Sequence, residues 1–114
     1  NDLGHIVGSH TYSHANLKGL IKSKLQYEIV DSKVKIESEL NTDCDFFAFP
    51  FGNDNYFDED SIKLVTKSYK FGFTSGLYDK YYYKKNKQIL SRRHFECDIP
   101  LNHLLYFTSQ IRNY

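Results

Sequence analysis

The chain contains no methionine, only two cysteines and two prolines, and a formal net charge of +1. Its apolar runs fall far short of the roughly 18 to 20 residues that a membrane-spanning helix needs, so we expect no membrane span. No basic start followed by an apolar stretch indicates a secretory signal peptide. Because the chain opens on Asn1 and has no initiator methionine, we interpret it as a piece of a longer protein.

The two cysteines, Cys44 and Cys97, are too few for a disulfide framework and lack Cys-x-x-Cys spacing. Buried thiols, a single bridge and reactive groups all remain open interpretations. The cysteines therefore do not fix the compartment.

The size and charge of the chain limit its organisation and its partners. With 114 residues, 40% of them hydrophobic, we expect one core and a single domain over residues 1–114. The 15 Lys and Arg nearly balance the 14 Asp and Glu, so no strong field attracts nucleic acid or an anionic membrane. A neutral partner fits this composition better.

Extended and helical patterns alternate along the chain. Apolar residues recur at steps of three and four after Leu17, which predicts an amphipathic helix with Asn16 as its N-cap. The full prediction is strands at 6–10, 46–52, 71–76 and 89–95, helices at 17–40, 58–69 and 100–112, and a loop at 78–88. This order predicts an α/β fold, with a parallel sheet or a piece of a β/α barrel and its site at the carboxyl ends of the strands.

A histidine pair lies where that rule expects chemistry. His10 and His14, in the stretch S-H-T-Y-S-H-A-N-L, follow the first predicted strand, and neutral imidazoles commonly bind zinc and related divalent ions. Taken alone, this spacing is equally typical of hydrogen-bonded loop histidines. His5, His94 and His103 are weaker candidates.

Two longer motifs give the pair its context. G-H-I-V-G-S-H-T-Y-S-H-A-N-L (4–17) resembles the second motif of the polysaccharide deacetylases, carbohydrate esterase family four. F-A-F-P-F-G (47–52) is similar to the family's third motif, Phe-Arg-x-Pro-Tyr-Gly, and 63–76 is similar to the helix and strand that follow it. The resemblance spans nearly the whole chain but only the later part of the family's domain.

The resemblance implies a partial, distorted β/α barrel that holds one divalent ion, zinc first, and removes acetyl groups from N-acetylated polysaccharides or oligosaccharides. His10 and His14 match the histidine ligands. The backbone N–H of Phe51 matches the donor that holds the oxyanion. For the parent protein, the implied substrate is a cell-envelope or extracellular glycan.

The chain also departs from the family pattern. The first motif, Thr-Phe-Asp-Asp-Gly, supplies the general base and an aspartate ligand, but no Asp-Asp pair occurs in this sequence. We therefore expect a domain piece that lacks its first strand and helix and is inactive alone, with the exposed sheet edge favouring a homodimer. An Asp-Asp pair upstream of Asn1 favours an enzyme, whereas its absence favours a non-catalytic carbohydrate-binding module.

Two further positions depend on the resemblance. Ala48 stands where the family often has an arginine, and in I-L-S-R-R-H-F (89–95) Arg92 is the candidate to replace it, although a solvated strand-end arginine is equally compatible. The residue that would act as general acid is open between His94 and His103.

Tyrosines and lysines at 78–88 are interpreted as a sugar-stacking rim or as an exposed loop, and the low net charge argues against nucleic acid.

Overall fold

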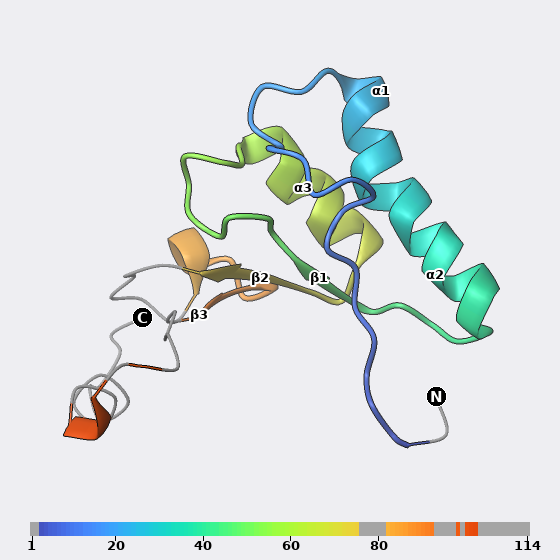
Figure 1. Cartoon of the computed structure of the whole chain (residues 1–114). Helices are drawn as coiled ribbons and strands as arrows, with labels where there is room; N and C mark the ends of the chain where they lie inside the picture. Colours follow the sequence, from blue (N-terminus) through green and yellow to red (C-terminus); the bar gives the residue numbers. More distant parts are fainter. Residues whose placement is uncertain (1–2, 76–81, 93–97, 99, 103–114) are drawn as a thin grey trace.

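The computed structural model describes residues 3–75, 82–92, 98 and 100–102. The described elements are α1 (Lys22–Leu25), the π-helical η1 (Gln26–Asp31), α2 (Ser32–Leu40), β1 (Phe46–Ala48), α3 (Glu59–Ser68), β2 (Phe71–Ser75), the 3₁₀ turn η2 (Tyr83–Lys85) and β3 (Ile89–Arg92). The three strands form a parallel sheet in the order β1-β2-β3 (Figure 1). The predicted α/β class with parallel strands is confirmed. The described residues do not form a closed barrel, and most of the helix predicted at 100–112 lies outside them.

The strand predicted at 6–10 is reduced to a single bridge. The Ser9 N–H donates to the Phe46 carbonyl at 2.8 Å, and the Ala48 N–H donates to the Ser9 carbonyl at 2.9 Å. The flanking residues Ile6 and Val7 are exposed and make no ladder with β1. The segment nevertheless runs parallel to β1, so His10 follows at the carboxyl edge of the sheet, as predicted.

The elements α1, η1 and α2 follow one another without a break and form one long helix. This long helix begins later than predicted, at Lys22, and its N-cap is Ile21 rather than Asn16. Asn16 instead accepts a hydrogen bond from the Lys18 N–H (3.0 Å) and closes a turn. Gly19, at φ +75°, then turns the chain in a left-handed conformation that an L-residue rarely adopts. These two turns delay the start of the helix beyond the first apolar residue of the pattern.

The helix predicted at 58–69 is confirmed as α3. The Asp58 side chain accepts from the Ser61 N–H while the Ser61 hydroxyl accepts from the Asp58 N–H, which completes a capping box. The second Asp58 oxygen accepts from the Gly19 N–H at 2.7 Å and so joins α3 to the turn before α1.

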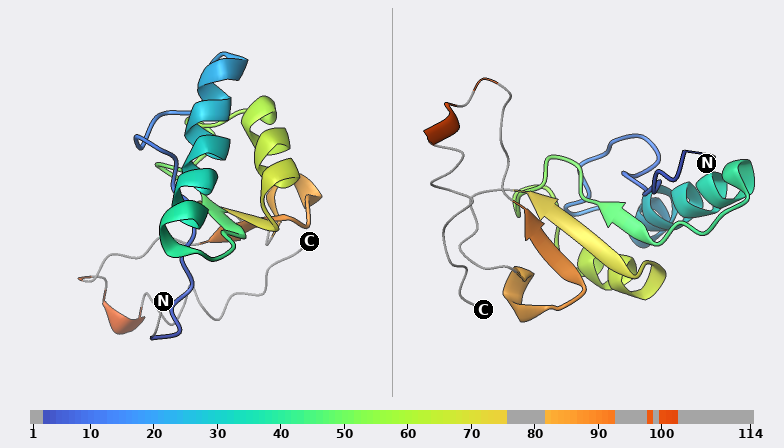
Figure 2. Two further views of the ribbon diagram at one scale, coloured as in Figure 1. Left: turned by 90° about the vertical axis from the view of Figure 1, so that its right-hand side faces the viewer. Right: turned by 90° about the horizontal axis from the view of Figure 1, so that it is seen from below.

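The helices cover one face of the sheet. The core between them includes Ile29, Phe47, Val65 and Ile89, and the view from below in Figure 2 shows the face that α1 to α3 leave uncovered. On that face Phe71 keeps 39% of its surface exposed. The homodimer expected from the exposed sheet edge stays a prediction. No described helix has the length and apolar content required to cross a membrane.

The structure also places the cysteine and tyrosine candidates. Cys44 has a free thiol and is fully buried, whereas Cys97 lies outside the described residues. Tyr83 packs edge-on against Phe57, with ring centroids 5.3 Å apart, and belongs to the margin of the core rather than to an open rim. Residues 78–81 of the predicted rim lie outside the described part of the chain.

Candidate active site

His10 is hydrogen-bonded to Ala48, the last residue of β1. Its Nδ1 lies 2.8 Å from the Ala48 carbonyl oxygen. A carbonyl only accepts, so Nδ1 carries the proton, and in the neutral ring Nε2 keeps its lone pair. A hydrogen bond of this kind commonly orients a metal-binding histidine, and the exposed Nε2 is therefore the atom available to bind an ion.

His14 lies beside His10 and completes the pair. The two ring centroids are 4.8 Å apart with an interplanar angle of 64°. Two imidazoles that share one zinc ion at Zn–N distances of about 2.0–2.1 Å can adopt this separation. The structure thus brings together the two histidines that the sequence singled out.

The aromatic turn of the third motif meets the histidines from the other side. Phe51 packs edge-on against His14, with ring centroids 4.8 Å apart. Within the described part of the chain, no group accepts a hydrogen bond from the Phe51 N–H. Phe51 is 51% exposed, so the residue lies at the surface of the site.

Three residues around this site have left-handed backbone. Thr11 has φ 68°, His14 has φ 59° and Phe51 has φ 63°. A β-branched residue at positive φ is a genuine outlier, and Thr11 also buries its hydroxyl without a partner among the described residues. Such strain is typical of functional loops that the surrounding structure holds in place.

Arg92 lies on the same face of the sheet as Ala48 but one row further toward the carboxyl edge, opposite Ser75. Its Nε donates to the Thr74 carbonyl at 3.3 Å, and its guanidinium lies 5.5 Å from the Phe73 ring centroid. Partial burial lowers the pKa of Arg92. No described carboxylate forms an ion pair with it, so its predicted role stays a prediction. His94 and His103 lie outside the described residues.

Sequence reasoning missed Glu28. This residue is only 6% exposed, on η1, and both of its carboxylate oxygens bind the loop between the two histidines. A signal for it exists, since Glu28 comes three residues after Leu25 and four before Ser32 and thus lies on the buried stripe. A carboxylate on such a stripe requires polar partners.

The donor set fits a divalent ion in part. Two imidazoles supply nitrogen ligands of the type that zinc prefers. Within the described residues, no third His, Cys, Asp or Glu joins them to form a ligand cluster. In the described part of the chain, His10 and His14 are thus the two neighbouring side chains of a type that binds a divalent ion.

Comparison with known proteins identifies the family. Residues 1–73 match the family described as polysaccharide deacetylase. The chain belongs to the polysaccharide deacetylase family. The matched region contains the histidine pair, the aromatic turn and the helix that holds the histidine loop.

Solved structures of this family share the fold. A polysaccharide deacetylase from Bacillus cereus is 26% identical with a TM-score of 0.59, over 76% of this chain and 27% of the other. A Bacillus anthracis protein assigned to the polysaccharide deacetylases is 25% identical with a TM-score of 0.58, over 75% of this chain and 27% of the other. The chain thus spans about a quarter of the length of these relatives. No curated protein matches it.

Proposed function

We propose that this chain forms the histidine side of a metal-dependent active site that hydrolyses the acetyl amide of N-acetylated sugars in a polysaccharide. The observation that carries the proposal is the meeting of His10, His14 and Phe51 at one edge of the sheet. Both ring-to-ring separations are 4.8 Å, although the residues come from two segments on either side of the long helix. Membership of the deacetylase family supports the same chemistry.

His10 and His14 would hold the ion, with zinc as our first choice. When bound, such an ion polarises the acetyl carbonyl and lowers the pKa of a bound water. The Ala48 carbonyl keeps Nε2 of His10 free for this purpose. The Phe51 N–H donates to the oxygen that becomes negatively charged, since a preorganised backbone donor stabilises an oxyanion. Water adds to the acetyl carbon, the C–N bond breaks, and acetate and a free amine are released.

The finer features belong to the same proposal. The sheet is part of a partial, distorted β/α barrel, and the exposed Phe51 ring packs against the C–H face of a sugar. The glycan is a cell-envelope or extracellular one. Because no described carboxylate joins the histidines, we expect the 114-residue chain alone to release no acetate.

A chimera tests the proposal. In the Bacillus cereus deacetylase, the segment similar to this chain is replaced by residues 3–92, and acetate release from N-acetylated oligosaccharides is measured. We expect activity that is lost in the His10→Ala/His14→Ala variant and retained in Glu39→Ala, a surface control whose side chain pairs with Lys35.

Two results would count against the proposal. A folded chimera without activity would contradict a catalytic role for these residues. Binding of N-acetylated oligosaccharides without turnover, unaffected by the histidine substitutions, would instead identify a carbohydrate-binding module.

A further inference from the structure

The loop between the two histidines is attached to the long helix by one buried carboxylate. Oε2 of Glu28 accepts from the backbone N–H groups of Tyr12 and Ser13, each at 2.9 Å. The Ser13 hydroxyl donates to the other oxygen, Oε1, at 2.5 Å. Three donors from two consecutive loop residues therefore converge on a single side chain.

Neighbouring positions of the same helix reinforce this attachment. Tyr27 stacks on Tyr12, with ring centroids 4.5 Å apart and planes 28° apart. The Ser32 hydroxyl is hydrogen-bonded to the Ser9 hydroxyl at 2.8 Å, immediately before His10. The contacts from this stretch thus lie on both sides of His10 and directly before His14. They come from the π-helical turn η1 and the residue that follows it, and π-helical turns are frequent at functional sites.

The backbone of the loop requires such an attachment. Thr11 and His14 both have positive φ, which costs free energy for residues other than glycine. The Tyr12 and Ser13 N–H groups that bind Glu28 lie between these two strained positions. Without the Glu28 carboxylate, the loop loses three of the hydrogen bonds that hold the conformation in which His14 lies against His10 and Phe51.

We propose that Glu28 is a positioning residue that fixes the His10-to-His14 loop, and with it the His14 imidazole, in the geometry that binds the metal ion. The inference rests on the proposed function and deepens it. Glu28 acts neither as a ligand nor as the general base, because both of its oxygens are occupied by the loop. It acts through His14, as the hydrogen-bonded partners behind metal ligands do in other sites.

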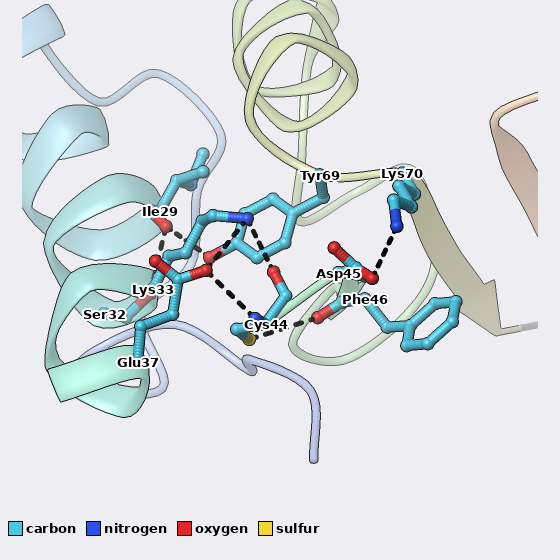
Figure 3. Close-up of polar contacts among 9 residues, drawn as sticks. All are labelled: Ile29, Ser32, Lys33, Glu37, Cys44, Asp45, Phe46, Tyr69 and Lys70. Atoms are coloured by element: carbon cyan, nitrogen blue, oxygen red, sulfur yellow. Dashed lines mark hydrogen bonds and ion pairs between the residues drawn. The ribbon is translucent and has the colours of Figure 1, made fainter. Parts of the chain in front are cut away.

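Glu37 is a matched control on the same helix. Its Oε1 accepts from the Cys44 N–H at 3.0 Å and lies 3.4 Å from Nζ of Lys33, as Figure 3 shows. Like Glu28, it connects the helix to the backbone of a distant loop, but that loop lies before β1, at the opposite edge of the sheet. Loss of either carboxylate costs stability, whereas only loss of Glu28 should affect metal binding.

Zinc titration calorimetry on the 114-residue chain separates these roles. We expect Glu28→Ala to lower the zinc affinity about 10- to 100-fold, as loss of a partner behind a ligand typically does. Glu28→Gln should retain most of the affinity, because its carbonyl oxygen still accepts from Tyr12 and Ser13 while its amide donates to the Ser13 hydroxyl. Glu37→Ala should bind zinc as the unsubstituted chain does. Far-UV circular dichroism confirms folding of each variant.

Equal zinc affinity in Glu28→Ala and the unsubstituted chain would overturn the inference, as would an equal loss in Glu37→Ala. Absence of zinc binding by the unsubstituted chain would contradict the metal site itself. In that case NMR decides the role of Glu28 without metal, through the nuclear Overhauser contact between the His14 and Phe51 rings. We expect that contact to disappear in Glu28→Ala and to persist in Glu37→Ala, and its persistence in both would overturn the positioning role.

Discussion

At each of the two edges of the sheet, a glutamate on the helix accepts hydrogen bonds from the backbone of a loop, but the two loops differ in what they expose. At the carboxyl edge, Glu28 accepts backbone N–H groups of the histidine loop; at the amino edge, Glu37 accepts the Cys44 N–H (Figure 3). Cys44 is fully buried, whereas His10 and His14 are exposed. A carboxylate on the helix therefore anchors a loop at either edge, and the loop at the carboxyl edge carries the exposed His10 and His14.

The backbone differs between the edges as well. The carboxyl-edge loops contain Thr11, His14 and Phe51 at positive φ, while the loop before β1 has only Asn41, which ends α2 in the common left-handed C-cap. Three of the non-glycine residues at positive φ thus lie where the histidines and the aromatic turn meet, and Lys84 and Lys85 of η2 are two others. The cost of the strain at the carboxyl edge is tolerated because the helix and the sheet hold these loops from behind.

Among the substitutions that test the difference between the two edges, we expect Gly52→Ala in the aromatic turn to lower the free energy of unfolding most. Gly52 has φ +77°, and a Cβ there would overlap the Ser75 Cβ and lie only 2.9 Å from the Ser75 carbonyl oxygen. The Gly52 carbonyl also accepts from the Ser75 N–H at 2.8 Å, which joins the aromatic turn to the end of β2. We expect a loss of at least about 2 kcal/mol in the free energy of unfolding, measured by urea titration.

Gly19→Ala is the control for that substitution. Gly19 has φ +75°, but a Cβ added there would meet no heavy atom within 4 Å, so only conformational strain is added. We expect a loss of about 1 kcal/mol. Equal losses for the two variants would show that the contact between the aromatic turn and β2 contributes nothing.

A smaller effect is expected for Asp58→Ala, because Asp58 caps α3 and also accepts from the Gly19 N–H. Loss of an N-cap typically costs about 0.5–2 kcal/mol. Burial raises the pKa of Asp58, but hydrogen bonds from Gly19 and Ser61 outweigh it and lower the pKa overall. The stabilisation is therefore present above the ordinary pKa of 3.8 and is lost as the pH falls through the folded-state value.

Asp60→Ala serves as the comparison, since Asp60 lies in the first turn of α3 without capping it. Urea titration at pH 7 should show a clear loss for Asp58→Ala and a small one for Asp60→Ala. Matching losses would contradict the capping role.

The smallest effect concerns charge at the amino edge. The hydrogen bond from the Cys44 N–H lowers the pKa of Glu37 below its ordinary value of 4.5, with Lys33 adding to the shift. Glu37→Gln keeps an acceptor and removes only the charge, so we expect a loss of at most about 1 kcal/mol at pH 7. A carboxylate with a lowered pKa stabilises the fold only while it is ionised. The difference in the free energy of unfolding between the two proteins should therefore shrink as the pH falls below 4.5. A difference that grows in acid would refute this assignment.

Much of the fold was predictable from local patterns. Asp58 before an apolar stripe predicted the start of α3, and the alternation along β3 predicted that Leu90 and Arg92 share one face of the sheet while Ile89 and Ser91 share the other. The start of the first helix was not predictable from apolar spacing, because the turns at Asn16 and Gly19 depend on tertiary contacts such as the Asp58 carboxylate.

The histidines and the aromatic residue of the candidate site were predictable from the sequence, but the residue that holds the histidine loop was not. The spacing and the flanking motifs singled out His10, His14 and Phe51, and the structure brings their rings together. The role of Glu28 depends on a contact between residues 15 and 16 positions apart, which no local pattern encodes. Only its place on a buried stripe marked it as unusual.

Zinc calorimetry on the 114-residue chain, beside the His10→Ala/His14→Ala double variant, tests the central claim most directly. We predict binding of one ion per chain that is abolished by the double substitution. Equal heats of binding for the two proteins would contradict a metal site formed by this pair of histidines.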